Sequence, residues 1–180
     1  MKGVINKGIQ EMVVSRYGGA TWEAVKRKAQ VEEEMFLLTE DYPDEGTLRL
    51  VEAAAEILEL PVEGVMVEFG RYWFTQVAPV LYPSYLALAG SNPVEMLKNV
   101  DRIHRLVTRN IPSASPPSFH VEEREDGMLR LHYFSTRGLC PVVRGLVEGV
   151  GRYFGKIMAV TEVECVHRGD HHCIFEVFQR

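Results

Sequence analysis

Residues 129–137 read Leu-Arg-Leu-His-Tyr-Phe-Ser-Thr-Arg and indicate the architecture of the last third of the chain. Residues 129–135 have the composition of a β-strand, and so do residues 118–123. Between them lies Glu125-Asp126-Gly127, a sequence typical of a hairpin turn. We therefore predict an antiparallel hairpin here.

One helix and two more strands are expected after this hairpin. The apolar residues of 141–155 recur at helical spacing. Residues 156–166 and 172–179 read as strands on either side of Arg168-Gly169-Asp170. The last third is thus predicted to be a β-β-α-β-β lobe with a four-stranded antiparallel sheet.

The first two thirds of the chain read as helices. Apolar spacing and stop signals such as Gly18-Gly19 predict helices over 4–17, from Thr21 onward, over 45–58 and from Pro61 to about Val77. The predicted fold class is therefore α+β, an N-terminal helical lobe followed by the lobe that holds the sheet. We expect a single domain, residues 1–180, whose lobes are residues 1–60 and 61–180.

Composition narrows the class of protein. The 180 residues are 46% hydrophobic and 25% charged, as in a soluble globular protein. A formal charge of −5 gives no electrostatic reason to expect a nucleic acid or an acidic membrane as partner. The chain has neither an apolar run that could span a bilayer nor a signal peptide, so a cytoplasmic protein is expected.

A histidine lies on the apolar face of the helix expected to begin at Asn92. Asn92 suits the N-cap, Pro93 suits the first helical position, and Glu95 completes a capping box. The apolar stripe then runs through Leu97, Val100, His104 and Val107, so His104 should point toward the core. Such a histidine is often a structural core residue, but neutral imidazole is also the commonest side chain that holds heme iron.

The strand residues quoted first offer a second group of polar side chains. Alternate side chains of a strand share a face, so Tyr133, Ser135 and Arg137 should point the same way. Two hydroxyls and a guanidinium aimed together would bind carboxylates such as the two propionates of heme. The alternative is the solvated polar face of a half-buried strand.

Together these residues resemble the heme nitric oxide/oxygen binding (H-NOX) family over essentially the whole chain. The match is to its bacterial standalone members. The motifs that carry the resemblance are Met1-Lys2-Gly3, Asp101-Arg102-Ile103-His104, Pro116-Pro117, Tyr133-x-Ser135-x-Arg137 and Gly145-Leu146-x-x-Gly149.

The resemblance implies a b-type heme between the two lobes. His104 would be the iron ligand, Tyr133, Ser135 and Arg137 would bind the propionates, and Pro117 would pack on the porphyrin. In the family, nitric oxide weakens or breaks the bond between iron and histidine and so shifts one lobe against the other. Such a ligand acts through its different affinity for two conformations.

The gas is expected to be nitric oxide, with carbon monoxide as a surrogate. Family members that bind oxygen stably carry a distal tyrosine, and the matching residue here is Val142. The other residues expected in the distal pocket are Ile5, Ile9, Trp73, Val77 and Leu146, each of which could equally be ordinary core. An apolar pocket offers bound oxygen little stabilisation.

Catalysis is not expected. A heme peroxidase would need a distal histidine, and no histidine precedes His104. The chain shows no kinase, cyclase or methyl-accepting signature, so its output should lie in another protein. The resemblance implies a histidine kinase or a cyclic-di-GMP enzyme as that partner.

All three cysteines lie after residue 139, which does not suit a secreted disulfide framework. Cys140, Cys165 and Cys173 could instead supply three thiolates to tetrahedral zinc, or they could be buried small hydrophobic residues.

A branch of the H-NOX family carries cysteines at these three positions, binds zinc there and has a proposed redox role. That branch has a histidine where this chain has Glu162, so the fourth ligand could be Glu162, His167 or His172. The alternatives to a nitric oxide sensor are therefore a zinc/thiol redox sensor and a small-molecule-binding regulatory domain of the V4R type.

Overall fold

The predicted hairpin is present in the computed structural model, which describes residues 1–111 and 114–180. Strand β1 (Ser118–Glu123) pairs with β2 (Leu129–Phe134), and the turn between them brings Gly127 to a positive φ of 79°. The Asp126 carboxylate accepts a hydrogen bond of 3.0 Å from the Met128 N–H. A glycine is needed at this φ because a Cβ would be strained there.

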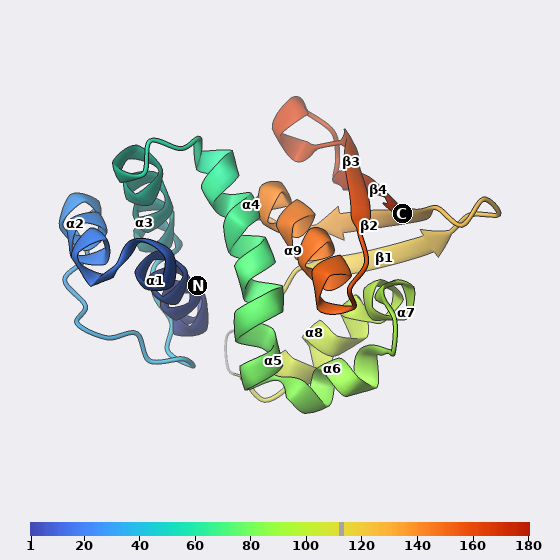
Figure 1. Ribbon diagram of the computed structural model, residues 1–180, viewed down its shortest axis with the longest axis horizontal. Helices are drawn as coiled ribbons and strands as arrows, with labels where there is room; N and C mark the ends of the chain where they lie inside the picture. The colour runs from blue at the N-terminus through green and yellow to red at the C-terminus, as the bar shows by residue number, and fades with distance from the viewer. Residues whose placement is uncertain (112–113) are drawn as a thin grey trace. The chain divides into compact units, whose positions relative to one another are not determined.

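The sheet of the second half has four antiparallel strands, as predicted. Strand β4 (Cys173–Gln179) pairs with β2, and β3 (Met158–Glu164) pairs with β4, which gives the order β1-β2-β4-β3 (Figure 1). The turn η2 (Val166–Arg168) follows β3.

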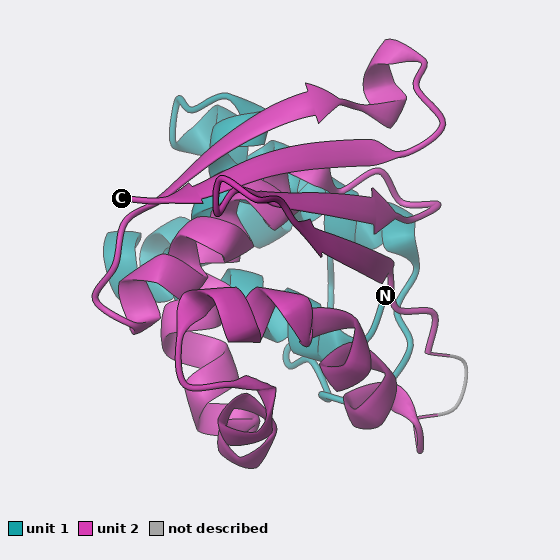
Figure 2. Ribbon diagram, turned by 90° about the vertical axis from the view of Figure 1, so that its right-hand side faces the viewer, with its two compact units in different colours: residues 1–69 teal, residues 70–180 magenta. Residues whose placement is uncertain are grey.

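The two faces of the sheet differ in burial. Leu131, Tyr133 and Phe175 face the hydrophobic core, whereas Arg130 and His132 point to the opposite face. The helices of this half lie on the core side of the sheet (Figure 2).

By contacts the chain divides into two compact units, Met1–Phe69 and Gly70–Arg180 (Figure 2). The division falls within α4 (Val62–Tyr72), later than the boundary expected after residue 60.

Unit 1 is helical. Its helices are α1 (Gly3–Tyr17), α2 (Gly19–Ala29), α3 (Asp44–Ile57) and most of α4. Apolar residues at helical spacing, such as Ile9, Val13 and Leu50, are almost fully buried. The buried Asn6 accepts a 2.7 Å hydrogen bond from the Thr47 hydroxyl, which satisfies both groups inside this core.

Unit 2 adds further helices to the sheet. They are the π-helix η1 (Trp73–Val77), α5 (Ala78–Leu81), α6 (Pro83–Ala89), α7 (Pro93–Lys98), α8 (Val100–Thr108) and α9 (Cys140–Tyr153). No helix among the residues described is both long and apolar enough to cross a membrane.

Two local expectations are wrong. The single helix expected after Asn92 is interrupted at Asn99, whose side chain donates hydrogen bonds to the carbonyls of Ala89 (2.9 Å) and Glu95 (3.0 Å). The strand expected to reach Ser135 ends at Phe134, because the chain turns there.

Candidate functional site

His104 lies on α8 with one ring nitrogen engaged by the main chain. Its Nδ1 is 3.1 Å from the Val100 carbonyl oxygen, one helical turn earlier. The Nδ1–H donates to this oxygen, so Nε2 keeps its lone pair. The ring is half-buried and stacks on Phe119, with centroids 5.3 Å apart and an interplanar angle of 19°.

The surroundings of His104 favour its neutral form. Desolvation lowers the pKa of the imidazole, and the contact with the Val100 carbonyl and the charge of Asp101 offset only part of that effect. A neutral imidazole with a free Nε2 is the form that binds iron.

Phe119 connects His104 to the strand that carries Tyr133. Its ring lies 5.3 Å from the Tyr133 ring, and its main-chain N–H donates a 3.0 Å hydrogen bond to Asp101 Oδ1. Arg105 Nη1 in turn lies 2.9 Å from Asp101 Oδ2. Neither Phe119 nor Asp101 is predicted from sequence to have a role at this site. Phe119 shares the buried face with Tyr133 in the strand register, and this signal could have identified it.

Tyr133, Ser135 and Arg137 lie close together, though not through strand alternation. Only Tyr133 belongs to β2, and the other two residues lie in the turn that follows. The Tyr133 hydroxyl makes hydrogen bonds with the Ser135 side chain and the Leu139 main chain, and Ser135 Oγ accepts a 3.2 Å bond from the Arg137 N–H. Arg137 Nη1 donates to the Ser115 carbonyl at 2.8 Å.

Tyr133 is nearly fully buried, and this burial raises the pKa of its hydroxyl. It therefore remains a neutral hydrogen-bond donor at neutral pH. Hydroxyl groups and a guanidinium within one turn have the chemistry needed to bind carboxylates. Pro117 is half-buried and directly precedes β1.

The expected distal residues belong to both units. Ile5 and Ile9 lie on α1 of unit 1, where Ile9 is fully buried. In unit 2, Val142 and Leu146 lie on α9. Trp73 and Val77 lie on the π-helix η1, and Trp73 and Leu146 pack against the core of this unit.

The three cysteines converge in the core of unit 2. The Cys140 and Cys173 sulfurs are 2.7 Å apart, and the Cys165 sulfur lies 3.7 Å from that of Cys140 and 3.9 Å from that of Cys173. All three are free and buried thiols. They lie at the start of α9, directly after β3 and at the start of β4, so tertiary structure creates the cluster.

Glu162 joins the three thiols. One of its carboxylate oxygens and the three sulfurs all lie within 4.8 Å of one another, as the ligands of one metal ion do. The two histidines considered for this position are engaged elsewhere. His167 Nε2 is 2.7 Å from the Gly138 carbonyl oxygen, and His172 Nε2 is 2.9 Å from His132 Nδ1.

The environment of the thiols suits a bound cation. Desolvation raises the pKa of Cys140, and the neighbouring thiols raise it further. Desolvation also raises the pKa of Cys165. Thiolates would therefore form here only with a positive charge such as Zn²⁺ beside them, since buried negative charge needs compensation.

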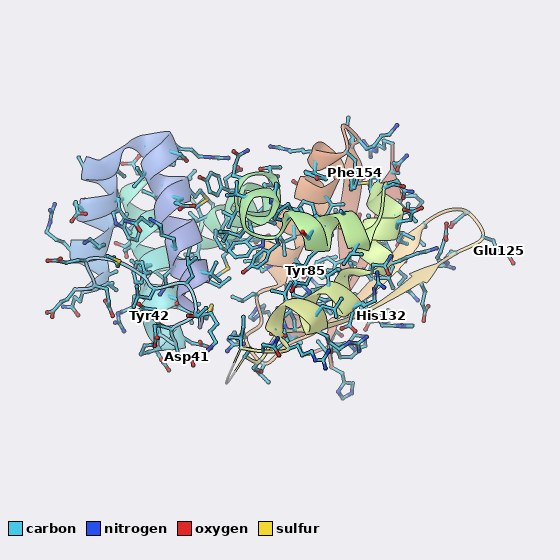
Figure 3. The ribbon with its side chains drawn as sticks, turned by 90° about the horizontal axis from the view of Figure 1, so that it is seen from below. Asp41, Tyr42, Tyr85, Glu125, His132 and Phe154 are labelled. Atoms are coloured by element: carbon cyan, nitrogen blue, oxygen red, sulfur yellow. The ribbon has the colours of Figure 1, made fainter. Side chains whose placement is uncertain are left out.

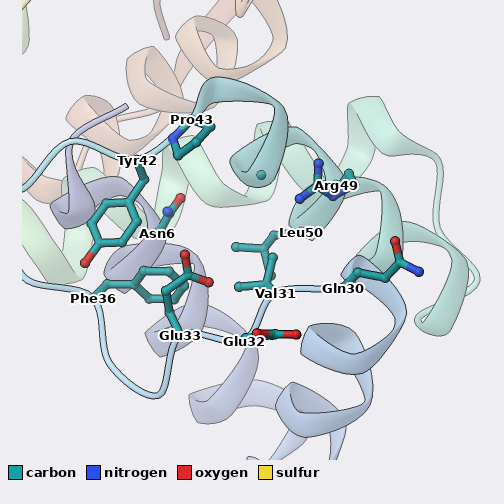
Figure 4. A pocket seen from close by; sticks show the side chains of 11 residues that line it. Asn6, Gln30, Val31, Glu32, Glu33, Phe36, Tyr42, Pro43, Arg49 and Leu50 are labelled. Carbon is teal, nitrogen blue, oxygen red and sulfur yellow. The ribbon is translucent and has the colours of Figure 1, made fainter.

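A surface pocket of about 480 Å³ lies within unit 1 and is unrelated to these residues. Its lining includes Asn6, Phe36, Tyr42, Arg49 and Leu50 (Figure 4). None of the residues expected to contact heme or zinc lines it. This pocket therefore does not locate the chemistry suggested by His104 or the cysteines.

Comparison with known protein families gives a match over most of the chain. The family model described as haem-NO-binding matches residues 2–162. The chain is 28% identical over 172 residues to soluble guanylate cyclase gcy-35 of Caenorhabditis elegans, covering 91% of this chain and 24% of that protein. It is 33% identical over 127 residues to guanylate cyclase soluble subunit beta-2 of Rattus norvegicus, covering 66% of this chain and 18% of that protein. The chain thus spans about a quarter or less of the length of these relatives.

Solved structures share the fold over the whole chain. An H-NOX protein from Shewanella oneidensis in the Fe(II)NO ligation state has a TM-score of 0.90 at 21% identity, covering 100% of this chain and 99% of that one. An unliganded Fe(II) H-NOX protein from K. algicida has a TM-score of 0.86 at 22% identity, covering 100% and 97%.

Proposed function

Because the chain belongs to the haem-NO-binding (H-NOX) family, which binds heme and gaseous ligands such as nitric oxide, we propose that it is a nitric oxide sensor whose b-type heme is held by His104. The observation that carries this proposal is the state of His104: neutral, on a rigid helix, with Nδ1 on the Val100 carbonyl and Nε2 available. Ferrous heme would supply the iron at which the gas binds.

The protein's part begins with orienting the imidazole. The Val100 carbonyl fixes the tautomer, and Phe119 supports one face of the ring. Main-chain acceptors of this kind fix the orientation of a ligating histidine and raise its basicity.

Tyr133, Ser135 and Arg137 would hold the two propionates. These residues already form hydrogen bonds with one another and with the nearby main chain. Their donor groups could instead form hydrogen bonds with a bound carboxylate. Arg137 also balances negative charge, which a buried carboxylate requires.

We further propose that the distal side selects nitric oxide over oxygen. The residues expected there, Ile5, Ile9, Trp73, Val77, Val142 and Leu146, are hydrophobic, and Val142 stands where oxygen-binding members carry tyrosine. Bound oxygen is polar and needs a hydrogen-bond donor, whereas nitric oxide does not.

The output would pass to a separate signalling protein in the cytoplasm, a histidine kinase or a cyclic-di-GMP enzyme. Release of His104 would free α8 to move, since no residue of this helix is fully buried. A helix that buries little apolar surface costs little to displace.

Absorption spectra of the reduced protein test the sensor. We expect a Soret band that is unchanged by air and shifts when nitric oxide is added. His104→Ala should lose heme, and added imidazole should restore it, because imidazole replaces the missing ligand. His171→Ala removes an exposed histidine and should retain heme. Heme absent from the wild type, or held unchanged by His104→Ala, would rule the proposal out.

A second function is favoured by the convergence of three sulfurs and a carboxylate. We propose that Cys140, Cys165, Cys173 and Glu162 bind Zn²⁺ and that oxidation releases it. Hydrogen peroxide would accept two electrons from two thiolates, which would then be joined as a disulfide. With two protons from solvent, the peroxide would be reduced to two water molecules.

Metal analysis tests this second site apart from heme. The purified protein should contain zinc equimolar to the chain, and Cys165→Ser should contain none while retaining heme. Glu162→Gln should bind zinc more weakly, since it keeps the size of the side chain but removes its charge. Peroxide should release zinc from the wild type. A wild type without zinc, or zinc retained in Cys165→Ser, would contradict this site.

A further inference from the structure

Three histidines gather on the face of the sheet that points away from the core. His120 lies on β1, His132 on β2, and His172 immediately before β4. We propose that these three imidazoles form a binding site for a divalent transition-metal ion, separate from both the heme site and the cysteine cluster. Neither heme nor the thiols take part in it, so it goes beyond the proposed function.

The central pair has the separation of two neighbouring metal ligands. His132 Nδ1 and His172 Nε2 lie 2.9 Å apart, and their rings stack with centroids 5.2 Å apart. Imidazole nitrogens bind such ions at about 2.0–2.1 Å, which puts two adjacent ligands of one ion about 3 Å apart. An ion could therefore take up both nitrogens with little movement of either ring.

Packing holds His172 in place beside His132. The Phe134 ring stacks on the His172 ring with centroids 4.4 Å apart and an interplanar angle of 14°. A ligand held by packing loses less rotamer entropy when the metal binds.

His120 can supply a third nitrogen. It is the direct cross-strand partner of His132, and the two ring centroids are 5.8 Å apart. Its Nε2 lies 3.2 Å from Glu122 Oε1, which leaves Nδ1 without a partner among the contacts described. A carboxylate on the second nitrogen of a histidine is the usual support for a metal ligand. The side chain is 66% exposed, so rotation toward the central pair is unhindered.

The hydrogen bonds described for these three histidines leave one buried ring nitrogen unsatisfied. Among the described residues, His132 Nε2 is buried and has no hydrogen-bond partner. Desolvation lowers the pKa of His132, and the nearby His172, His120 and Arg130 lower it further, against the opposing charge of Glu122. The 2.9 Å contact with His172 therefore satisfies only one ring nitrogen of His132.

The donors set the class of ion. Imidazole nitrogen suits Ni²⁺, Cu²⁺ and Zn²⁺, whereas Mg²⁺ and Ca²⁺ prefer oxygen ligands. The proposed histidine site is separate from the cysteine cluster, although Cys173 directly follows His172 in sequence. Cys173 is buried in the core, while His172 contacts His132 and Phe134 on the other side of the sheet (Figure 3 labels His132).

Calorimetric titration with Ni²⁺ tests the site, because Ni²⁺ does not oxidise thiols. The protein should carry no polyhistidine tag and should be loaded with heme and zinc beforehand. We expect one Ni²⁺ ion per chain, bound about tenfold or more weakly by His132→Gln and also more weakly by His120→Asn. His171→Gln is the matched control, an exposed neighbour outside the cluster, and should bind like the wild type.

Three results would overturn the site. The first is that the wild type takes up no Ni²⁺. The second is that His120→Asn and His132→Gln bind Ni²⁺ as tightly as the wild type does. The third is the appearance of sulfur-to-nickel charge-transfer bands, which would show that the ion is bound by the cysteines. If His132→Gln does not fold, as judged by its circular dichroism, His120→Asn decides alone, because the exposed His120 can be replaced without disturbing the core.

Discussion

Between Asn99 and His104, single side chains are tied to main-chain atoms rather than to one another. Asn99 donates to the Ala89 carbonyl, Asp101 accepts from the Phe119 N–H, and His104 meets the Val100 carbonyl. A side chain held by the main chain has a fixed direction, because the acceptor or donor belongs to a rigid element. The orientation of His104 thus depends on the Val100 carbonyl as well as on the stacked Phe119 ring.

Glu95 gives a prediction at this scale. Hydrogen bonds from the Ser91 main chain and side chain lower the pKa of this exposed carboxyl group. A carboxyl group whose pKa is lower in the folded state stabilises the fold above its ordinary pKa. That contribution is lost as the pH falls through the lowered value. Glu95→Gln should therefore melt at a lower temperature than the wild type near neutral pH, and the difference should shrink at about pH 3.

Thermal melts at both pH values measure this effect. Glu125→Gln, at the exposed tip of the hairpin (Figure 3), is the control and should change the melting temperature little at either pH. A Glu95→Gln deficit that is equally large in acid would mean that the carboxylate charge plays no part in the cap.

At the scale of elements, the sequence was sufficient to predict features that depend only on residues close together in the chain. The N-cap at Asn92 is such a case, since the Glu95 N–H donates to Asn92 Oδ1 at 2.9 Å, while the Glu95 carboxylate accepts from the Ser91 N–H, one residue before the cap. The hairpin turn at Gly127 is another, because a positive φ depends on one residue. Both were predictable from a few neighbouring letters.

Features that depend on distant residues were not predictable in this way. The break at Asn99 needs the Ala89 carbonyl, which only the packed structure brings near. Phe119 next to His104 likewise depends on how β1 packs on α8. The proximity of Glu162 to the three sulfurs likewise depends on the pairing of β3 with β4. Sequence indicated the residue types of the site, and tertiary contacts selected among them.

The close approach of Gly70 to α9 provides a prediction for an element. A Cβ added to Gly70 would lie 2.2 Å from the Val142 carbonyl oxygen and 2.7 Å from the Leu146 nitrogen, both main-chain atoms that cannot move aside alone. Gly70→Ala should therefore destabilise the protein by about 1–3 kcal/mol, the usual cost of overpacking.

Denaturant unfolding of Gly70→Ala measures this cost, and the same helix supplies the control. At Gly64 the nearest atom to an added Cβ is Pro61 Cδ at 3.7 Å, an ordinary contact. Gly64→Ala should be neutral or stabilising by up to about 1 kcal/mol, because alanine favours the helix. Equal effects of the two substitutions would show that helix propensity outweighs the close approach.

At the scale of the whole molecule, one helix serves two proposed functions. Helix α9 begins with Cys140 of the thiol cluster and carries Val142 and Leu146 of the expected gas pocket. A change of the cluster upon oxidation would act on the first turn of that helix. The two inputs would then be coupled through a rigid element, which is the physical basis required of such coupling.

Val142 is where gas selectivity for the whole domain can be tested. Replacing it with tyrosine places a hydroxyl on the first turn of α9, at the position where oxygen-binding members of the family have one. The reduced Val142→Tyr protein should change its absorption spectrum in air, whereas the wild type should not, because the hydroxyl can donate a hydrogen bond to oxygen. Val142→Phe adds a similar ring without the donor and should behave like the wild type in air.

If the absorption spectrum of Val142→Tyr shifts with nitric oxide but does not change in air, Val142 does not face the gas, and selectivity must depend on other residues. If the wild type itself responds to air, the pocket does not discriminate against oxygen, and the assignment to nitric oxide fails while the heme site stands.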